Sequence, residues 1–424
     1  MADLAPFSGF RFNPGVVDVA AASAPPYDVL DDDARRTLLG RCDHSVVVID
    51  LPVPPSVTAA GQSPPEAYAE AGATLRRWID QGVLIADPPS LYVHRMRWTA
   101  ADGQRSTIGV MGALALGEDP VLDGPSPDDT TTASGGNTGP SPADVLPHEH
   151  TTPKASSDRL ELMRATDANL SPIWVVTPAT GFADLLTSVA LGPPVVALTS
   201  ADGVHHDLWV VPDGPQCAAI GAALADHPVV VADGHHRLQT ARRHRRELRE
   251  SHRESVGADR ILALVTELVD GTVEIEGIHR LVTSWPTDAE PSADMATLFD
   301  LTPVTHDDPL VPCLAAADSL GLVTASGRWL ARPHRGGAAA DFDSQRLAAA
   351  FDSIGVTEVV FHHDEAHVTT MVRSGHAVAA ILVRPPTVDQ ILAVAHGGQR
   401  MPPKSTFFAP KPCTGMVIRM LEGS

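Results

Sequence analysis

A β-branched run leads directly into a glycine turn and a long helical pattern at residues 228–250, and this stretch constrains the fold more than any other. The run PVVVA ends at Ala232, Asp233 and Gly234 form the turn, and HHRLQTARRHRRELRE has helical periodicity. A buried strand followed at once by a helix is the repeating step of proteins built from sheets and helices. The sequence therefore predicts a mixed α/β (α+β) fold.

Further helices and strands are expected along the rest of the chain. Helices are predicted at PPEAYAEAGATLRRWIDQG, ending at Gly82, and at SSDRLELMRATDANL, with Ser156 or Ser157 as its N-cap. LYVHRMRWT and STIGVMGALAL predict a hairpin. The remaining predicted strands are SVVVI (45–49), SPIWVVTP (171–178), RILALVTELVD (260–270), TVEIEGIHRLV (272–282), TEVVFHH (357–363), HVTTMVRS (367–374) and AVAAILVR (377–384).

A polar segment at residues 118–144 divides the chain. It is rich in Pro, Gly, Ser, Thr and Asp and has almost no apolar side chain to bury. We predict four parts: an N-terminal α/β lobe at 1–117, a flexible insertion at 118–146, a core with the glycine turn at 147–285, and a C-terminal α/β region at 286–424.

Charge and hydropathy exclude two classes of partner. A net charge of −21 repels a nucleic-acid backbone over most of the surface. The arginines at 242–249 alternate with Glu247 and Glu250 at spacings that favour ion pairs on a solvated helix face. No apolar run reaches the roughly 18 residues that cross a bilayer, and the N-terminus lacks a basic region followed by an apolar stretch. We expect a cytoplasmic protein with no general nucleic-acid binding and no membrane partner, and its oligomeric state stays open.

The turn at 233–237 has the features of an anion site. Unpaired N–H groups at a helix start point outward, the helix dipole favours negative charge, and Gly234 permits a close approach. His235 and His236 add donors, and Arg237 can grip two phosphate oxygens. The alternative is a helix cap in which Asp233 satisfies its own backbone amides. Capping requires neither the histidines nor the arginine, so we predict a phosphate site with Asp233, His235 and His236 in catalytic roles.

Lysine is rare in this chain, which makes its positions informative. Only three of the 31 basic residues are lysines, and two of them lie in RMPPKSTFFAPKPCTG at 400–415. An ammonium is a compact point charge, whereas a guanidinium prefers bidentate contacts. Surface lysines are the alternative. The cations and hydroxyls of this loop predict a second phosphate-facing wall, formed by Arg400, Lys404, Ser405, Thr406 and Lys411.

The stretch PHEH at 147–150 offers a general base. A histidine pair with one residue between can bind a metal, and a carboxylate between two histidines can have its pKa tuned for proton transfer. A polar surface loop is the third interpretation. We take Glu149 as the candidate base and leave any metal ligand open. The candidate substrate-binding residues are Tyr27, Asp28, Arg159, His279 and Arg280.

Several motifs occur in a fixed order: APPYDV, PHE-T followed by DR-L-L, ADGHHR--TA, HR at a strand end, and RMP-KSTFF-PK--TG. With them the chain closely resembles the domain-of-unknown-function 1015 family of bacterial proteins over nearly its whole length. The resemblance implies a ParB/sulfiredoxin-like core with additional α/β lobes. That superfamily includes CTP-binding partition proteins and free serine kinases with a DGH-R motif. Partition proteins have a Gly-Glu-Arg-Arg core and a helix-turn-helix reader, and this chain shows neither, so the kinases are more similar.

The resemblance to free serine kinases implies that Asp233, His235 and Arg237 handle phosphate. We expect a phosphotransferase acting on a small hydroxylated metabolite, foremost free L-serine, with ATP, ADP or pyrophosphate as donor and Mg²⁺ as cofactor. The expected partners are therefore the small-molecule substrate and the phosphate donor. The main alternative is a ParB-like regulatory protein that binds CTP without turnover, and a metabolite-binding scaffold is the third.

Overall fold

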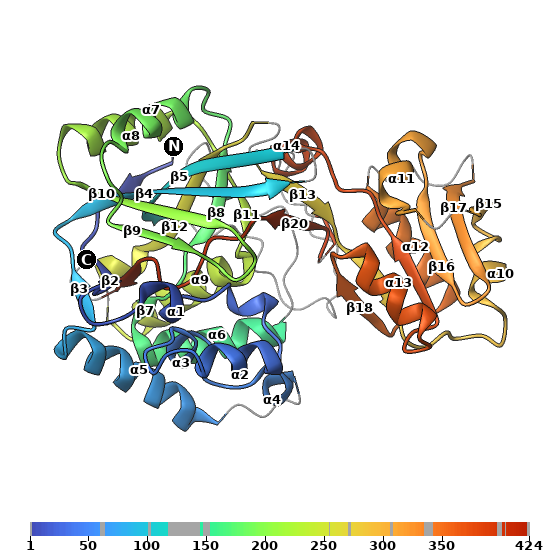
Figure 1. Ribbon diagram of the computed structural model, residues 1–424, viewed down its shortest axis with the longest axis horizontal. Coiled ribbons are helices and arrows are strands. Elements are labelled where there is room, and N and C mark those ends of the chain that lie inside the picture. The colour runs from blue at the N-terminus through green and yellow to red at the C-terminus, as the bar shows by residue number, and fades with distance from the viewer. Residues whose placement is uncertain are drawn as a thin grey trace. The chain divides into compact units, whose positions relative to one another are not determined.

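The structure is a computed structural model of the 424-residue chain (Figure 1). It contains both helices and β-sheets, which confirms the predicted mixed α/β class. The residues that it describes are 2–59, 64–100, 103–117, 145–146, 153–253, 255–269, 273–305, 308–334, 342–396, 401–402 and 404–421.

Two compact units make up the chain. Unit 1 draws its described residues from Met1–Pro147, Thr151–Val273 and Pro410–Ser424, and unit 2 draws its described residues from Glu274–Ala409. Unit 1 is therefore interrupted by unit 2 in sequence and completed by residues that follow it. The predicted four-part division, with boundaries after residues 117, 146 and 285, stays a prediction.

The largest sheet of unit 1 has the order β6-β11-β8-β12-β5-β4-β10-β9, with β1 paired to β5. β4 and β5 form the predicted long hairpin, from Tyr92 opposite Met111 to Ala100 opposite Gly103. Helices α7 and α8 cover one face of this sheet (Figure 1). Its strands are β1 (Leu4–Ala5), β4 (Ser90–Ala100), β5 (Gly103–Ala115), β6 (Val145–Leu146), β8 (Ile173–Thr177), β9 (Val196–Thr199), β10 (His205–Pro212), β11 (Val229–Asp233) and β12 (Arg260–Glu267).

A smaller sheet of unit 1 has the order β3-β2-β21-β7. Its strands are β2 (Gly9–Phe12), β3 (Leu84–Ala86), β7 (Ala168–Asn169) and β21 (Ile418–Met420). On β21, Arg419 is 1% exposed and donates to the side chain of Asn169 and to the carbonyl oxygens of Gly257 and Arg260. Burial lowers the pKa of Arg419 to about 10. The C-terminal strand is thus an interior part of unit 1.

The helices of unit 1 include the two long helices that the sequence predicts. The segment that ends before Gly82 is α5, and the segment after the glycine turn is α9. A second core packs beside α5 around Phe12, Leu75 and Trp78. The helices are α1 (Val19–Ala22), α2 (Asp32–Leu39), α3 (Val47–Asp50), α4 (Pro55–Ala59), α5 (Pro65–Asp80), α6 (Pro153–Thr166), α7 (Phe182–Val189), α8 (Pro215–Ala225) and α9 (His235–Glu250), with 3-10 turns at Tyr27–Val29 and Val256–Asp259.

Two local predictions in unit 1 are wrong. SVVVI at 45–49 forms the short helix α3 instead of a strand, and Val47, Ile49 and Asp50 are all buried in it. A short apolar run buried on several sides has no period that separates helix from strand. Helix α6 starts at Pro153, so Ser156 and Ser157 lie inside it and neither is its N-cap.

Helix α9 is also less solvated than predicted. Arg242 and Arg245 are 7% and 4% exposed, although Arg243 forms the expected ion pair with Glu247. Arg242 Nη2 donates to the carbonyl oxygens of Leu116 and Val145, which flank the polar insertion. The reason is local: these guanidiniums satisfy backbone carbonyls where the strands around the insertion end.

Unit 2 has a sheet of order β15-β17-β16-β19-β14-β18 and a separate β13-β20 ribbon. Apolar clusters on this sheet are centred on Leu322 and Ile381 and on Val323 and Leu382. The strands are β13 (Glu274–Gly277), β14 (His279–Val282), β15 (Phe299–Pro303), β16 (Leu320–Thr324), β17 (Gly327–Pro333), β18 (Val359–His362), β19 (Ala379–Leu382) and β20 (Thr406–Ala409). The helices are α10 (Pro291–Met295), α11 (Val311–Ala317), α12 (Asp343–Ile354), α13 (Glu365–Arg373) and α14 (Val388–His396).

The predicted strand HVTTMVRS at 367–374 is wrong, because this segment belongs to α13. Asp364 caps the helix by accepting hydrogen bonds from the backbone N–H groups of Ala366 and His367. Val368 and Val372 then face the core at helical spacing. The cap overrides the β propensity of the valines and threonines. Within the described part of the chain, no helix is long and apolar enough to cross a membrane.

Candidate functional site

The site is built around the turn between β11 and α9. A register shift between Val231 and Asp233 marks a bulge at the end of β11, and Gly234 adopts φ 96° before the helix starts at His235. A Cβ at Gly234 would lie 2.9 Å from Ile173 Cγ2 and 3.1 Å from Arg237 Nε. Glycine is therefore required both by its conformation and by the close approach of its neighbours.

The start of α9 has no side-chain cap within the described residues. The alternative in which Asp233 caps its own helix stays open. The carboxylate of Asp233 binds two cations, Arg237 Nη2 at 2.5 Å and Lys411 Nζ at 2.9 Å. The backbone N–H groups of the first turn and these two cations gather at one end of the helix, where the dipole favours an anion.

Lys411 lies between two carboxylates in the loop before β21. Its Nζ is 2.5 Å from Asp28 Oδ2 as well as 2.9 Å from Asp233, and its side chain is only 8% exposed. Burial alone lowers the pKa of a lysine, but the carboxylates of Asp233 and Asp28 outweigh it and raise the pKa of Lys411 above its ordinary value. Lys411 is therefore a buried, charged ammonium shared by two acids.

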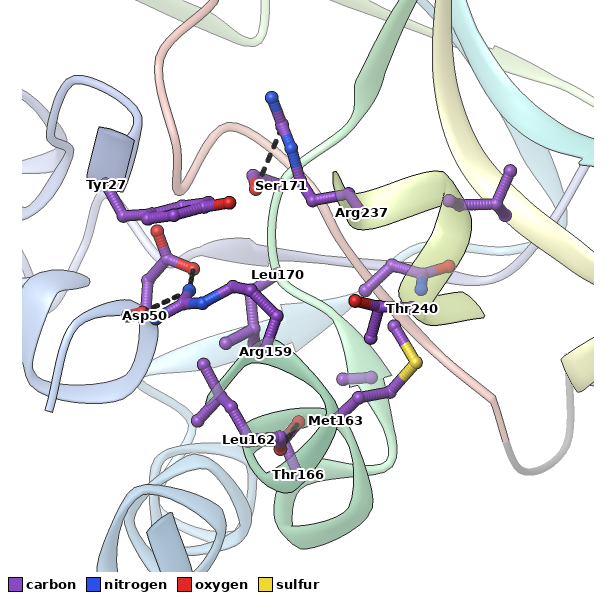
Figure 2. Close-up of a pocket in the computed structure, with 13 residues that line it drawn as sticks. Tyr27, Asp50, Arg159, Leu162, Met163, Thr166, Leu170, Ser171, Arg237 and Thr240 are labelled. Carbon is purple, nitrogen blue, oxygen red and sulfur yellow. Dashed lines mark hydrogen bonds and ion pairs between the residues drawn. The ribbon is translucent and has the colours of Figure 1, made fainter. Parts of the chain in front are cut away.

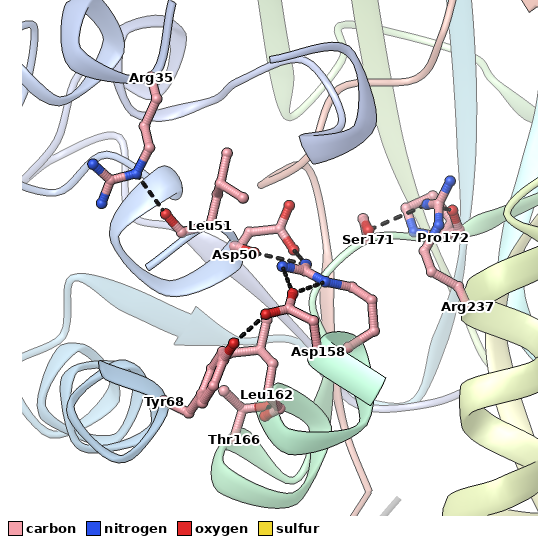
Figure 3. Close-up of polar contacts among 11 residues, drawn as sticks. Arg35, Asp50, Leu51, Tyr68, Asp158, Leu162, Thr166, Ser171, Pro172 and Arg237 are labelled. Atoms are coloured by element: carbon pink, nitrogen blue, oxygen red, sulfur yellow. Dashed lines mark hydrogen bonds and ion pairs between the residues drawn. The ribbon is translucent and has the colours of Figure 1, made fainter. Parts of the chain in front are cut away.

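Arg237 is held on its other side by the segment before β8. Its Nη1 donates to Ser171 Oγ at 3.2 Å and to the carbonyl oxygen of Pro172 (Figure 3). Burial lowers the pKa of Arg237, and the charge of Asp233 more than offsets this effect, so the guanidinium stays charged. Arg237 is thus held between the carbonyl of Pro172, just before β8, and the carboxylate of Asp233, at the end of β11.

A second ionic group lies beside the first. The Arg159 guanidinium stacks over the ring of Tyr27 at 3.9 Å and donates to Asp50 O at 2.7 Å and Oδ1 at 3.3 Å (Figure 2). It also pairs with Asp158 Oδ2 at 3.3 Å. Tyr68 donates to Asp158 in turn. Burial raises the pKa of Asp50 and raises that of Tyr27 to about 12. The edges of Arg159 thus face protein acceptors and its face covers Tyr27.

Four of these residues, Tyr27, Asp50, Arg159 and Arg237, border a hollow of about 40 Å³ (Figure 2). Figure 2 shows the hydroxyl end of Tyr27 directed toward Ser171 and Arg237. The two ionic groups together hold three cations and four carboxylates: Arg159, Arg237 and Lys411, with Asp28, Asp50, Asp158 and Asp233. Each of the three cations is paired with at least one carboxylate, and this pairing keeps the cations charged and in place.

The structure brings seven of the predicted site residues together in unit 1: Tyr27, Asp28, Arg159, Asp233, Gly234, Arg237 and Lys411. His235 and His236 open α9 beside them. Glu149 and Arg400 lie outside the described residues. The roles predicted for all of these residues stay predictions.

The other predicted site residues belong to unit 2. Ser405 donates to Pro402 O at 2.7 Å and to Ser344 Oγ at 3.0 Å, and Lys404 has φ 61°. Arg280 stacks over the ring of Phe361 at 4.9 Å. The unit 2 residues from the prediction are His279, Arg280, Lys404, Ser405 and Thr406.

Sequence reasoning missed Asp50, which anchors Arg159. The available signal was an acid that directly follows the apolar run SVVVI, because a carboxylate at the end of a buried segment needs a partner. No group of three or more His, Cys, Asp or Glu in the described chain is placed to hold a metal ion.

Comparison with known proteins gives a family and a set of distant folds. A family model described as "Protein of unknown function (DUF1015)" matches residues 4–357. No curated protein matches. Solved structures that resemble the chain include a free serine kinase in complex with AMP, at 13% identity and a TM-score of 0.37, covering 65% of this chain and 88% of that one.

Two other solved structures have similar scores. The C-terminally truncated SbnI from Staphylococcus aureus has 13% identity and a TM-score of 0.36, covering 64% of this chain and 82% of that one. A conserved hypothetical protein from Pyrococcus furiosus has 13% identity and a TM-score of 0.34, covering 65% and 90%. Likeness at this level supports no argument about activity.

Proposed function

This chain belongs to the DUF1015 protein family, and we propose that it is a phosphotransferase that transfers a phosphoryl group to a small hydroxylated metabolite, foremost free L-serine. The observation that carries the proposal is the sharing of Asp233 by Arg237 and Lys411 at the start of helix α9. Two buried cations at the first turn of a helix form a place where a polyphosphate can replace a carboxylate.

Charge balance determines the form in which the donor binds. The carboxylates already outnumber the cations, so a bare polyphosphate would add negative charge to a site that has no excess positive charge. A donor that arrives with Mg²⁺ brings the missing charge, and its phosphates supply metal ligands. We therefore propose that ATP, ADP or pyrophosphate binds as its magnesium complex and that Lys411 and Arg237 turn from Asp233 to the phosphate oxygens.

In the proposed reaction the acceptor oxygen forms a bond to phosphorus, the bond from that phosphorus to the donor's bridging oxygen breaks, and the hydroxyl proton passes to a base. The protein mainly positions the two reactants and stabilises spreading negative charge. Asp233 is the described candidate for the base, and Glu149 is the candidate outside the described residues. His235 and His236 would donate to phosphate oxygens from the first turn of α9.

Arg159 has a different proposed role. Because its edges are bonded to Asp50 and Asp158, we assign it to holding Tyr27 against the hollow, with Tyr27 and Asp28 facing the acceptor. We also propose that the protein has a ParB/sulfiredoxin-like core. We further propose that it acts in the cytoplasm and has no nucleic-acid or membrane partner. The wall predicted from Arg400, Lys404, Ser405 and Thr406 stays a proposal as well.

The test is a reaction of the purified full chain with L-serine, Mg²⁺ and each donor in turn, followed by ³¹P NMR for a phosphate monoester. We expect product with at least one donor, and a large loss of product with Arg237→Ala or Lys411→Ala. Arg243→Ala is the matched control, because Arg243 is on the same helix with a half-exposed side chain paired to Glu247. That variant should keep full activity.

Donor binding measured by calorimetry separates the remaining outcomes. Binding of CTP without product from any donor would favour the regulatory alternative. If no nucleotide and no pyrophosphate binds at millimolar concentration with Mg²⁺, the phosphate site itself is refuted.

A further inference from the structure

Unit 2 contains a hollow of its own, of about 430 Å³. Its wall includes Glu276 and His279 from the β13–β14 segment and His363, Asp364 and Glu365 from the β18–α13 turn. The size lies within the range of small-molecule sites. None of its lining residues belongs to unit 1.

His279 contributes a buried hydrogen-bond donor to this hollow. Its side chain is 2% exposed, and Val383 N–H donates to its Nδ1 at 3.3 Å. Burial lowers the pKa of His279 to about 4, so the ring is neutral near pH 7. A neutral imidazole that accepts at Nδ1 carries its proton on Nε2. Nε2 has no hydrogen-bond partner among the described residues, which leaves this N–H to a ligand.

His363 and Glu276 are joined by a hydrogen bond on the same wall. His363 Nδ1 lies 2.8 Å from Glu276 Oε2, and the imidazole ring is held parallel to Phe407 at 4.0 Å. The carboxylate accepts the Nδ1 proton, so the second oxygen of Glu276 keeps free acceptor capacity. The orientation of Glu276 is therefore fixed before any ligand binds.

The charge of the wall selects the ligand. Asp364 adds a second carboxylate, and the charge of Glu365 is balanced by Arg328 at 3.7 Å. The described lining residues include two unbalanced carboxylates, Glu276 and Asp364, and no lysine or arginine, so they repel phosphates and carboxylates. The described residues also hold no group that could bind a metal ion.

We propose that this hollow binds a small organic ammonium compound that also carries a hydroxyl or carbonyl oxygen. The ammonium faces Glu276 and Asp364, and the oxygen accepts the N–H of His279 Nε2. Ile275 and Val311 pack against the carbon chain between the two groups. The proposal does not depend on phosphate binding in unit 1.

Three small molecules that differ only in one terminal group test which charge the hollow prefers. Their binding to the full chain is measured by calorimetry or saturation-transfer NMR. The set is 3-amino-1-propanol, 1,3-propanediol and 3-hydroxypropionate, which share a three-carbon hydroxyl chain and differ only in a cationic, neutral or anionic head. We expect saturable binding of the amine and at least about tenfold weaker binding of the other two, since a charged hydrogen bond is lost. Equal binding of the three would overturn the proposal.

Variants locate the bound amine. Glu276→Gln changes a half-exposed side chain and should fold normally, and it should weaken amine binding about tenfold or more. His279→Phe keeps a buried ring and removes the donor, so it should weaken 3-amino-1-propanol but not propylamine. Arg237→Ala should bind the amine normally, whatever it does to nucleotides. Unchanged binding by Glu276→Gln, or loss by Arg237→Ala, would place the amine elsewhere and refute the site.

Discussion

Replacing Lys411 with methionine removes a buried charge and nearly preserves the side chain's size. The loss leaves Asp28 without its ammonium and removes one of the cations that bind Asp233, which keeps Arg237. Removing one partner of a buried ion pair costs about 3–5 kcal/mol. Because Asp28 is 25% exposed and Asp233 keeps one cation, we expect the lower end, about 3 kcal/mol of the free energy of unfolding.

Urea unfolding followed by circular dichroism measures this loss. The control is Arg36→Ala, which breaks an ion pair of similar length, 2.6 Å, whose side chains are 74% and 84% exposed. Exposed ion pairs contribute at most about 1 kcal/mol to stability. The free energy of unfolding of Arg36→Ala should therefore stay close to that of the wild type. If Lys411→Met lowers the free energy of unfolding no more than Arg36→Ala does, Lys411 is not a buried and paired ammonium.

The pH dependence gives an independent check on Lys411. Its pKa is raised in the folded state above the ordinary value of 10.5, so folding binds its proton more tightly than the unfolded chain does. This contribution is fully present below pH 10.5 and is lost as the pH rises from there through the folded pKa. The difference between the wild type and Lys411→Met should therefore be constant near neutral pH and shrink above pH 10.5.

Three further predictions concern the insertion, the turn and the second lysine. Deleting residues 120–142 should leave the melting temperature nearly unchanged, because Arg242 binds the carbonyls on both sides of the insertion and holds its ends together; a large drop would contradict this. Gly234→Ala should cost about 1–3 kcal/mol in urea unfolding, more than Gly375→Ala, whose φ is also positive but whose Cβ would meet nothing within 4 Å. If Lys404 lines the phosphate site, both Lys404→Ala and Lys404→Arg should weaken nucleotide binding in calorimetry, and normal binding by both would exclude it.

The elements that were predicted correctly are those whose periodicity and boundary residues lie within one continuous stretch of sequence. The β4–β5 hairpin, α5 and the β11–α9 turn each carry periodicity and boundary residues, and all three are confirmed. The two wrong strands, at 45–49 and 367–374, are short β-branched segments that tertiary packing and the Asp364 cap turn into helices. β propensity decides little in segments as short as these.

The site was predictable where its residues are neighbours in sequence. Asp233 and Arg237 are four residues apart, and the helix start brings them together. Lys411 and Asp28 are separated by 383 residues, and the scarcity of lysine and the motif RMP-KSTFF-PK--TG singled out Lys411 without indicating its partner. The pairing of Asp50 with Arg159 could not be predicted, because it depends on how α3 packs against α6.

The placement of β21 has a consequence for how this protein is made. Unit 1 receives its last strand and Lys411 only after the 136 residues from Glu274 to Ala409 have been translated, which takes about 7–27 s at 5–20 residues per second. During that time β2 and β7 lack the strand that joins them, and Asp28 and Asp233 lack their shared ammonium. The small sheet of the nascent unit 1 therefore stays incomplete until β21 has left the ribosome.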